Sequence, residues 1–100
     1  MAQRIAFQRA DGTPLGHYDV RDGSTLFRAV LRARLPLARS CRGDAVCAAC
    51  KVRILDGAEH VAPPGRAEIA LIEREPLRPG ERYACQARVH GPVTITTTYW

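Results

Sequence analysis

The sequence SCRGDAVCAAC fills residues 40–50 and contains three of the four cysteines of the chain. These three, Cys41, Cys47 and Cys50, follow a C-x5-C-x2-C spacing, and Cys85 stands alone nearer the C-terminus. Cys47 and Cys50 place two sulfurs on one tight turn, and the longer spacing back to Cys41 lets the segment curl around an object larger than a single ion. The residues between the cysteines are mostly small, which allows a close approach of the backbone. The layout predicts four thiolates converging on one inorganic centre.

The length and composition limit the class of protein. One hundred residues suffice for one domain, so we expect residues 1–100 to form a single domain and a monomer. Hydrophobic residues make up 46% of the chain and charged residues 25%, which is ordinary for a soluble globular protein. No apolar run approaches the roughly 20 residues that span a bilayer, and the first residues lack a signal-peptide core. We therefore predict a cytoplasmic protein with no membrane partner, where a cysteine cluster favours a metal site over disulfides.

The charge is basic but dispersed. The formal net charge is +5, and every basic residue except Lys51 is an arginine. Nucleic-acid binders typically combine a basic stripe with aromatic stacking platforms. The arginines here follow no such run, and none of the few aromatic residues lies within a basic cluster. The pattern argues against nucleic-acid binding and favours docking of a protein partner with an acidic face.

Hydrophobic periodicity predicts alternating short strands and two helices. Segments with period-two alternation predict strands over residues 4–8, 15–20, 51–55, 83–89 and 93–97. Apolar residues at helical spacing predict a main helix over residues 25–34 and a short helix over residues 66–74.

The ends of these elements carry local signals. Ser24 is a candidate N-cap for the main helix, and Pro36 ends that helix. Residues 36–50 show neither period, and a segment of that length without structure is usually functional in a small domain. Trp100 is expected to pack on the edge of the sheet. The element order predicts an α+β fold with a mixed sheet packed on one main helix.

Two segments carry a resemblance to a known family. Residues 40–54, from Ser40 to Ile54, resemble the cluster loop of [2Fe–2S] ferredoxins, and Arg82-Tyr83-Ala84-Cys85-Gln86 resembles the segment of their last ligand. The resemblance covers nearly the whole chain, because the element order matches the β-grasp ferredoxin fold. Plant-type ferredoxins have a C-x4-C-x2-C spacing. The extra residue here resembles adrenodoxin-like and bacterial assembly ferredoxins, which usually carry histidine where this chain has Lys51.

The resemblance implies a cofactor and its ligands. One [2Fe–2S] cluster per chain would be held by four cysteines as iron ligands: Cys41, Cys47, Cys50 and Cys85. The first two would hold the iron nearer the surface and the last two the buried iron. The backbone of the loop would surround the cluster and form the rim through which an electron leaves: Arg42, Gly43, Asp44, Ala45 and Val46.

The resemblance also implies a function without catalysis. The chain would carry one electron from a ferredoxin reductase to an acceptor enzyme such as an oxygenase or a P450, and would not itself be an enzyme. In related ferredoxins the short helix presents acidic residues to a reductase. Here this region carries Glu68, Glu73 and Glu75, and Arg66 and Arg74 dilute their negative charge. The alternative function is a regulatory or iron–sulfur assembly module whose redox state controls partner binding.

Other uses of four cysteines fit the sequence less well. Zinc ribbons usually pair two Cys-x-x-Cys knuckles, whereas this chain has one. A thioredoxin-like role for Cys47 and Cys50 would leave the other two cysteines without purpose. A Rieske centre needs two histidine ligands, and His17, His60 and His90 stand away from the cysteines in the sequence. These histidines are interpreted as ordinary surface or turn residues.

Overall fold

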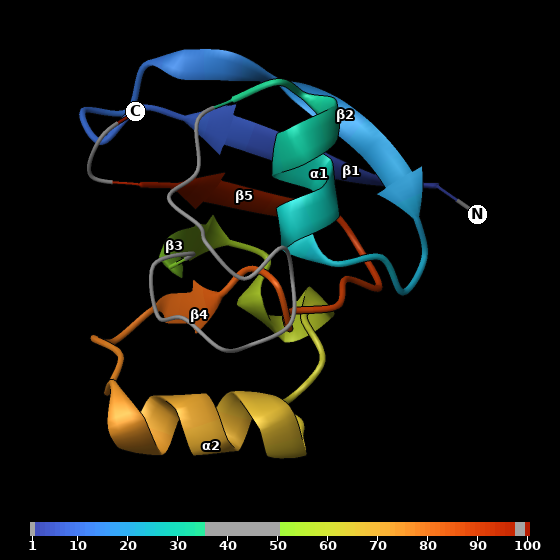
Figure 1. Ribbon diagram of the computed structural model, residues 1–100. Helices are drawn as coiled ribbons and strands as arrows, with labels where there is room; N and C mark the ends of the chain where they lie inside the picture. The colour runs from blue at the N-terminus through green and yellow to red at the C-terminus, as the bar shows by residue number, and fades with distance from the viewer. Residues whose placement is uncertain (1, 36–50, 98–99) are drawn as a thin grey trace.

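A five-stranded mixed sheet forms the body of the protein. The computed structural model describes residues 2–35, 51–97 and 100. The strands are β1 (Ala2–Gln8), β2 (Pro14–Arg21), β3 (Lys51–Asp56), β4 (Glu81–Tyr83) and β5 (Val93–Thr96), in the spatial order β2-β1-β5-β3-β4. Strand β5 runs parallel to β1, and the other neighbours are antiparallel. With helix α1 (Leu26–Arg32) across one face of the sheet (Figure 1), the predicted α+β, β-grasp architecture is confirmed.

The first hairpin follows from its turn chemistry. Gly12 takes a φ of +94°, a left-handed conformation that glycine adopts without steric cost. The backbone N–H of Thr13 donates to the Asp11 carboxylate at 2.9 Å, and this bond lowers the pKa of Asp11 below its ordinary value. Strands β1 and β2 therefore pair along nearly their whole length, as the sequence predicts.

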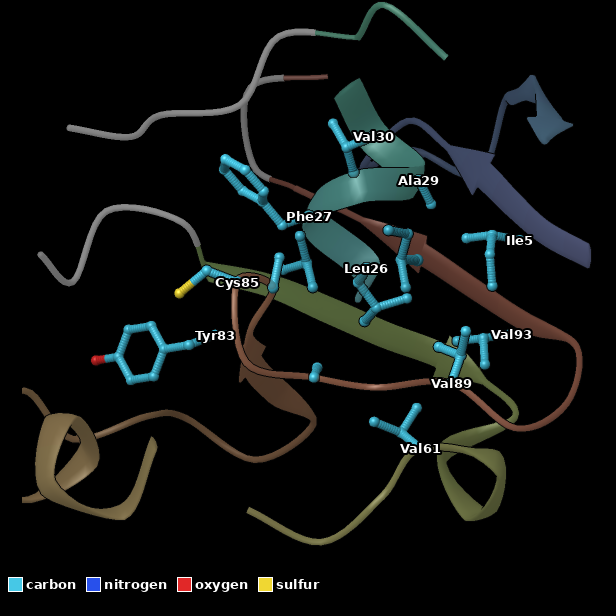
Figure 2. Close-up of a cluster of buried hydrophobic side chains, with 14 of the residues drawn as sticks. Ile5, Leu26, Phe27, Ala29, Val30, Val61, Tyr83, Cys85, Val89 and Val93 are labelled. Atoms are coloured by element: carbon cyan, nitrogen blue, oxygen red, sulfur yellow. The ribbon is translucent and has the colours of Figure 1, made fainter. Parts of the chain in front are cut away.

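Helix α1 supplies much of the core. Its buried face consists of Leu26, Phe27, Ala29 and Val30, which matches the predicted apolar stripe. Figure 2 shows these side chains packed with Ile5 of β1 and Val93 of β5. Burial of aliphatic side chains of this kind contributes roughly 1.5–3 kcal/mol each.

The ends of α1 differ from the prediction. Thr25, not Ser24, is the N-cap, because its Oγ1 accepts a hydrogen bond from the N–H of Arg28 at 3.2 Å. The helix ends at Arg32, short of the predicted Arg34, because Arg34 adopts a positive φ of 61°. Helix α2 (Arg66–Arg74) has the predicted bounds and lies beyond β4, at the end of the sheet away from β2 (Figure 1).

The strand predicted over residues 83–89 is wrong in most of its length. Strand β4 ends at Tyr83, and residues 84–86 form a turn in which the N–H of Gln86 donates to the carbonyl of Tyr83. Only isolated bridges follow, at Arg88 and Val89. The alternation of apolar residues has another cause: Tyr83, Cys85, Ala87 and Val89 are buried in the same hydrophobic cluster as the inner face of α1, although they do not form one continuous strand.

The remaining features are a short 3-10 turn, the packing of Trp100 and the character of the helices. A 3-10 turn, η1 (Ala58–His60), follows β3 and was not predicted. The Trp100 ring packs edge-on against Phe7 with ring centroids 5.8 Å apart, so it contacts the interior strand β1 rather than an edge strand. None of the helices in the described part of the chain has the length and apolar character needed to cross a membrane.

The turn after β3 depends on Gly57. This residue has a φ of +84°, and a Cβ added here would lie 2.3 Å from the carbonyl oxygen of Pro92. We predict that Gly57→Ala lowers the thermal unfolding midpoint by about 10 °C or more, because it adds a backbone clash to the strain of a left-handed residue. Circular dichroism melts of the two proteins measure this shift.

Gly12→Ala is the matched control. Gly12 has a similar φ of +94°, but a Cβ there meets nothing within 4 Å. This variant carries only the conformational strain of about 1 kcal/mol or slightly more. Equal midpoints for the two variants would show that the Pro92 contact does not constrain the turn.

Candidate functional site

Of the predicted cluster ligands, the structure describes Cys85. The other three, Cys41, Cys47 and Cys50, and the loop backbone from Arg42 to Val46 lie outside the described residues.

Cys85 lies in the turn after β4, held against the start of α1. The backbone N–H of Phe27 donates to the carbonyl of Ala84 at 3.0 Å, and that of Leu26 donates to the carbonyl of Ala87 at 2.9 Å. These two bonds use helix N–H groups that have no partner within the helix. Cys85 sits between the two carbonyls in sequence and is 5% exposed, and its sulfur points away from the packed aliphatic side chains (Figure 2).

The sheet register brings a second part of the chain toward Cys85. Strand β3 pairs antiparallel with β4, and Lys51 is aligned with Tyr83. Lys51 follows Cys50 in the sequence, and Tyr83 precedes Cys85 by two residues. The topology therefore aligns Lys51, the residue after one predicted ligand, with Tyr83 in the strand that leads into another.

A buried ion pair fixes the strand before Cys85. The Glu68 carboxylate of α2 is fully buried and accepts two hydrogen bonds of 2.7 Å from the guanidinium group of Arg82 in β4. The N–H of Tyr83 donates to the same carboxylate at 3.3 Å, and the Tyr83 hydroxyl donates to the carbonyl of Glu75. Bidentate, charge-assisted bonds of this kind fix orientation as well as distance.

This network bears on the acidic residues of the short helix, the region that faces a reductase in related ferredoxins. Glu68 is one of these residues, and its burial removes it from any docking face. The sequence did hold a signal, because Glu68 lies three residues before Leu71 and so on the same helix face as that buried side chain. Glu73 remains exposed on the helix, beside Arg74.

The histidines are engaged elsewhere, as interpreted from the sequence. Nδ1 of His60 donates to the carbonyl of Pro92 at 2.7 Å, and Nδ1 of His90 lies 3.2 Å from the Asp22 carboxylate. His17 is exposed on β2. Among the described residues, no group of three His, Cys, Asp or Glu side chains gathers as metal ligands.

The surroundings of Cys85 suit a thiolate bound to iron. A buried cysteine ligand is shielded from water, and polar N–H groups nearby offset its negative charge. The Gln86 side-chain amide lies 4.0 Å from the Cys85 sulfur, with Nε2 as the donor. This chemistry fits a cluster ligand.

The Glu68–Arg82 pair generates a prediction. Glu68→Gln keeps the shape of the side chain but leaves the largely buried Arg82 charge without its counterion, which we expect to cost about 2–4 kcal/mol. The thermal unfolding midpoint, followed by circular dichroism, should fall by about 10 °C or more.

Glu73→Gln is the matched control for this substitution. It makes the same change at an exposed position of the same helix and should shift the midpoint by no more than about 2 °C. A Glu68→Gln protein as stable as this control would show that the ion pair does not secure β4.

Comparison with known proteins agrees with this site. The family described as 2Fe-2S iron-sulfur cluster binding domain matches residues 11–90. A component of the Na(+)-translocating NADH-quinone reductase of Chlamydia felis is 33% identical over 76 residues, which cover 76% of this chain and 17% of that protein. The chain thus spans about a sixth of the length of this relative.

Solved structures share the fold. A reduced putidaredoxin variant from Pseudomonas putida has a TM-score of 0.73 and 25% identity, with 95% of each chain covered. A putidaredoxin in a covalent complex with putidaredoxin reductase gives a TM-score of 0.72 and 25% identity, covering 94% of this chain and 96% of that one. With the family match over most of its length, the buried Cys85 and the shared fold, the chain belongs to the [2Fe–2S] ferredoxin family, whose domain binds one [2Fe–2S] cluster.

Proposed function

We propose that this chain accepts one electron from a ferredoxin reductase and passes it to an acceptor enzyme, such as an oxygenase or a P450, in the cytoplasm. The observation that carries the proposal is the placement of Cys85, buried in a turn that α1 and β4 hold from two sides. The structural similarity to a putidaredoxin crystallised with its reductase supports a reductase as donor.

We further propose that the cluster is held by Cys41, Cys47, Cys50 and Cys85, within one domain over residues 1–100. When bound, a [2Fe–2S] cluster supplies reversible uptake and release of one electron. The chain supplies the rest: α1 and the Glu68–Arg82 pair orient the Cys85 segment, and the surrounding core keeps water from its thiolate.

The net positive charge of the chain indicates the charge of the surface on which a partner docks. Four thiolates and the oxidised di-iron core together carry a charge of about −2, which lowers the formal charge from +5 to about +3. A positive carrier is steered toward a negative surface, so we propose that its redox partners dock through acidic faces. Screening at high salt then slows the encounter.

Cys85→Ser tests the ligand assignment. We predict that the purified variant loses the visible absorbance of the cluster or releases its iron and sulfide within hours, because a serine hydroxyl is a poor substitute for a thiolate. Arg88→Ser, at an exposed position in the same segment, is the control and should keep the full spectrum. A coloured and stable Cys85→Ser protein would contradict the assignment.

Electron transfer itself is tested on the anaerobically purified protein. We expect about two irons and two sulfides per chain, uptake of one electron with an EPR signal of the reduced state, and reduction by a ferredoxin reductase that slows as salt rises. A regulatory module would instead show redox-dependent affinity for one partner without turnover. Zinc without acid-labile sulfide in the native protein would refute the electron-carrier proposal.

A further inference from the structure

A groove runs between the edge strand β2 and helix α1. It has a volume of about 440 Å³ and is lined by residues 18–21 of β2 together with Ser24, Arg28 and Arg32. In Figure 1, β2 lies at the end of the molecule opposite α2, and α1 crosses the face of the sheet. Nothing in the electron-carrier function described above accounts for this groove.

The charge of the groove is positive. Arg28 and Arg32 are four residues apart on α1 and therefore share one face of the helix, and Arg21 belongs to the lining at the end of β2. All three side chains are exposed, and within the described part of the chain none of their guanidinium groups forms an ion pair. The carboxylate in the lining is Asp19, and its Oδ1 lies 3.7 Å from Nε of Arg4, so a cation outside the lining already compensates it.

The groove also offers apolar and backbone contacts. Tyr18 is 36% exposed in the lining. Tyrosine and arginine are the residues most enriched where protein interfaces concentrate their binding energy. Strand β2 is the last strand on its side of the described sheet, so its outer edge presents unpaired backbone groups.

Helix α1 connects this groove to the cysteine segment. Phe27 precedes Arg28, and its N–H bonds to the carbonyl of Ala84, the residue before Cys85. A ligand in the groove would therefore contact the same short helix that holds Cys85 in place.

We propose that this groove docks an acidic polypeptide segment of a redox partner, with Arg28 and Arg32 pairing its carboxylates and Tyr18 packing against its backbone. The proposal rests on the electron-carrier function and adds the surface that a partner recognises. A protein segment fits better than a small anion, because small-molecule sites bury most of their ligand, whereas these arginines are exposed. Planar guanidinium groups suit bidentate pairing with carboxylates.

The experiment uses the holo-protein and a fluorescein-labelled peptide of eight glutamates, with eight glutamines as the uncharged peptide control. Fluorescence anisotropy at low salt measures the dissociation constant. We expect binding of the glutamate peptide alone, and weakening of at least tenfold in the Arg28→Glu, Arg32→Glu double variant. A second double variant, Arg66→Glu with Arg74→Glu, makes the same charge change on exposed positions of α2 and should weaken binding less than twofold.

Two outcomes of this experiment would overturn the docking proposal. Equal weakening in the two double variants would show a response to net charge alone. Complete displacement of the peptide by equimolar pyrophosphate would assign the groove to small anions. Visible absorbance and circular dichroism identify any variant that has not folded, and Tyr18→Ala, which retains every charge, then provides a second test with an expected weakening of about threefold.

Reduction by dithionite separates this proposal from the function on which it rests, because dithionite needs no docking surface. If the wild-type protein takes up no electron from dithionite, the electron-carrier proposal fails whatever the peptide does. If the protein is reduced but the peptide does not distinguish the two double variants, the docking proposal fails alone.

Discussion

The pairing of Glu68 with Arg82 is the interaction on which the cysteine site most depends. Burial of both charges costs free energy, and the bidentate geometry with a third bond from the N–H of Tyr83 offsets that cost. The pair joins α2 to β4 across a gap of fourteen residues in sequence. The orientation of β4 fixes where the following turn begins, and that turn carries Cys85.

The second constraint on this turn comes from α1, and here the helix has two roles. Its first N–H groups have no intrahelical partner, and two of them bond to the carbonyls of Ala84 and Ala87. The buried face of the same helix joins the core of the sheet. The seven-residue helix α1 thus contacts the hydrophobic core, the cysteine segment and the basic groove beside β2. The same helix therefore stabilises the fold and positions Cys85.

The sequence predicted those elements whose periodicity and ends are set locally. Helix α2 has the expected bounds, and β1, β2, β3 and β5 extend one or two residues beyond their predicted limits or end one residue short of them. The failure over residues 83–89 has a clear reason. Alternating buried residues arise in a strand, but they arise equally in a turn that packs against a helix, and periodicity alone cannot separate the two.

Residue contacts between distant segments were harder to predict. Glu68 is charged, and a charged side chain is expected on the surface unless a partner compensates its charge. Arg82 lies fourteen residues away, so no local pattern pairs the two. The groove arginines show the same limit, since Arg21 and Arg28 belong to different elements that only the packing of α1 on the sheet brings together.

By itself, the sequence determined the chemistry of the protein: four cysteines in a cluster-binding spacing, a basic net charge and an alternation of strands and helices typical of the ferredoxin fold. Those features are properties of residue types and their order, so they can be read without coordinates. Only the tertiary structure decided which charges are buried, which N–H groups hold Cys85 and which arginines line one groove. These depend on distances between segments far apart in the chain, and such distances are set by the packing of α1 and α2 against the sheet.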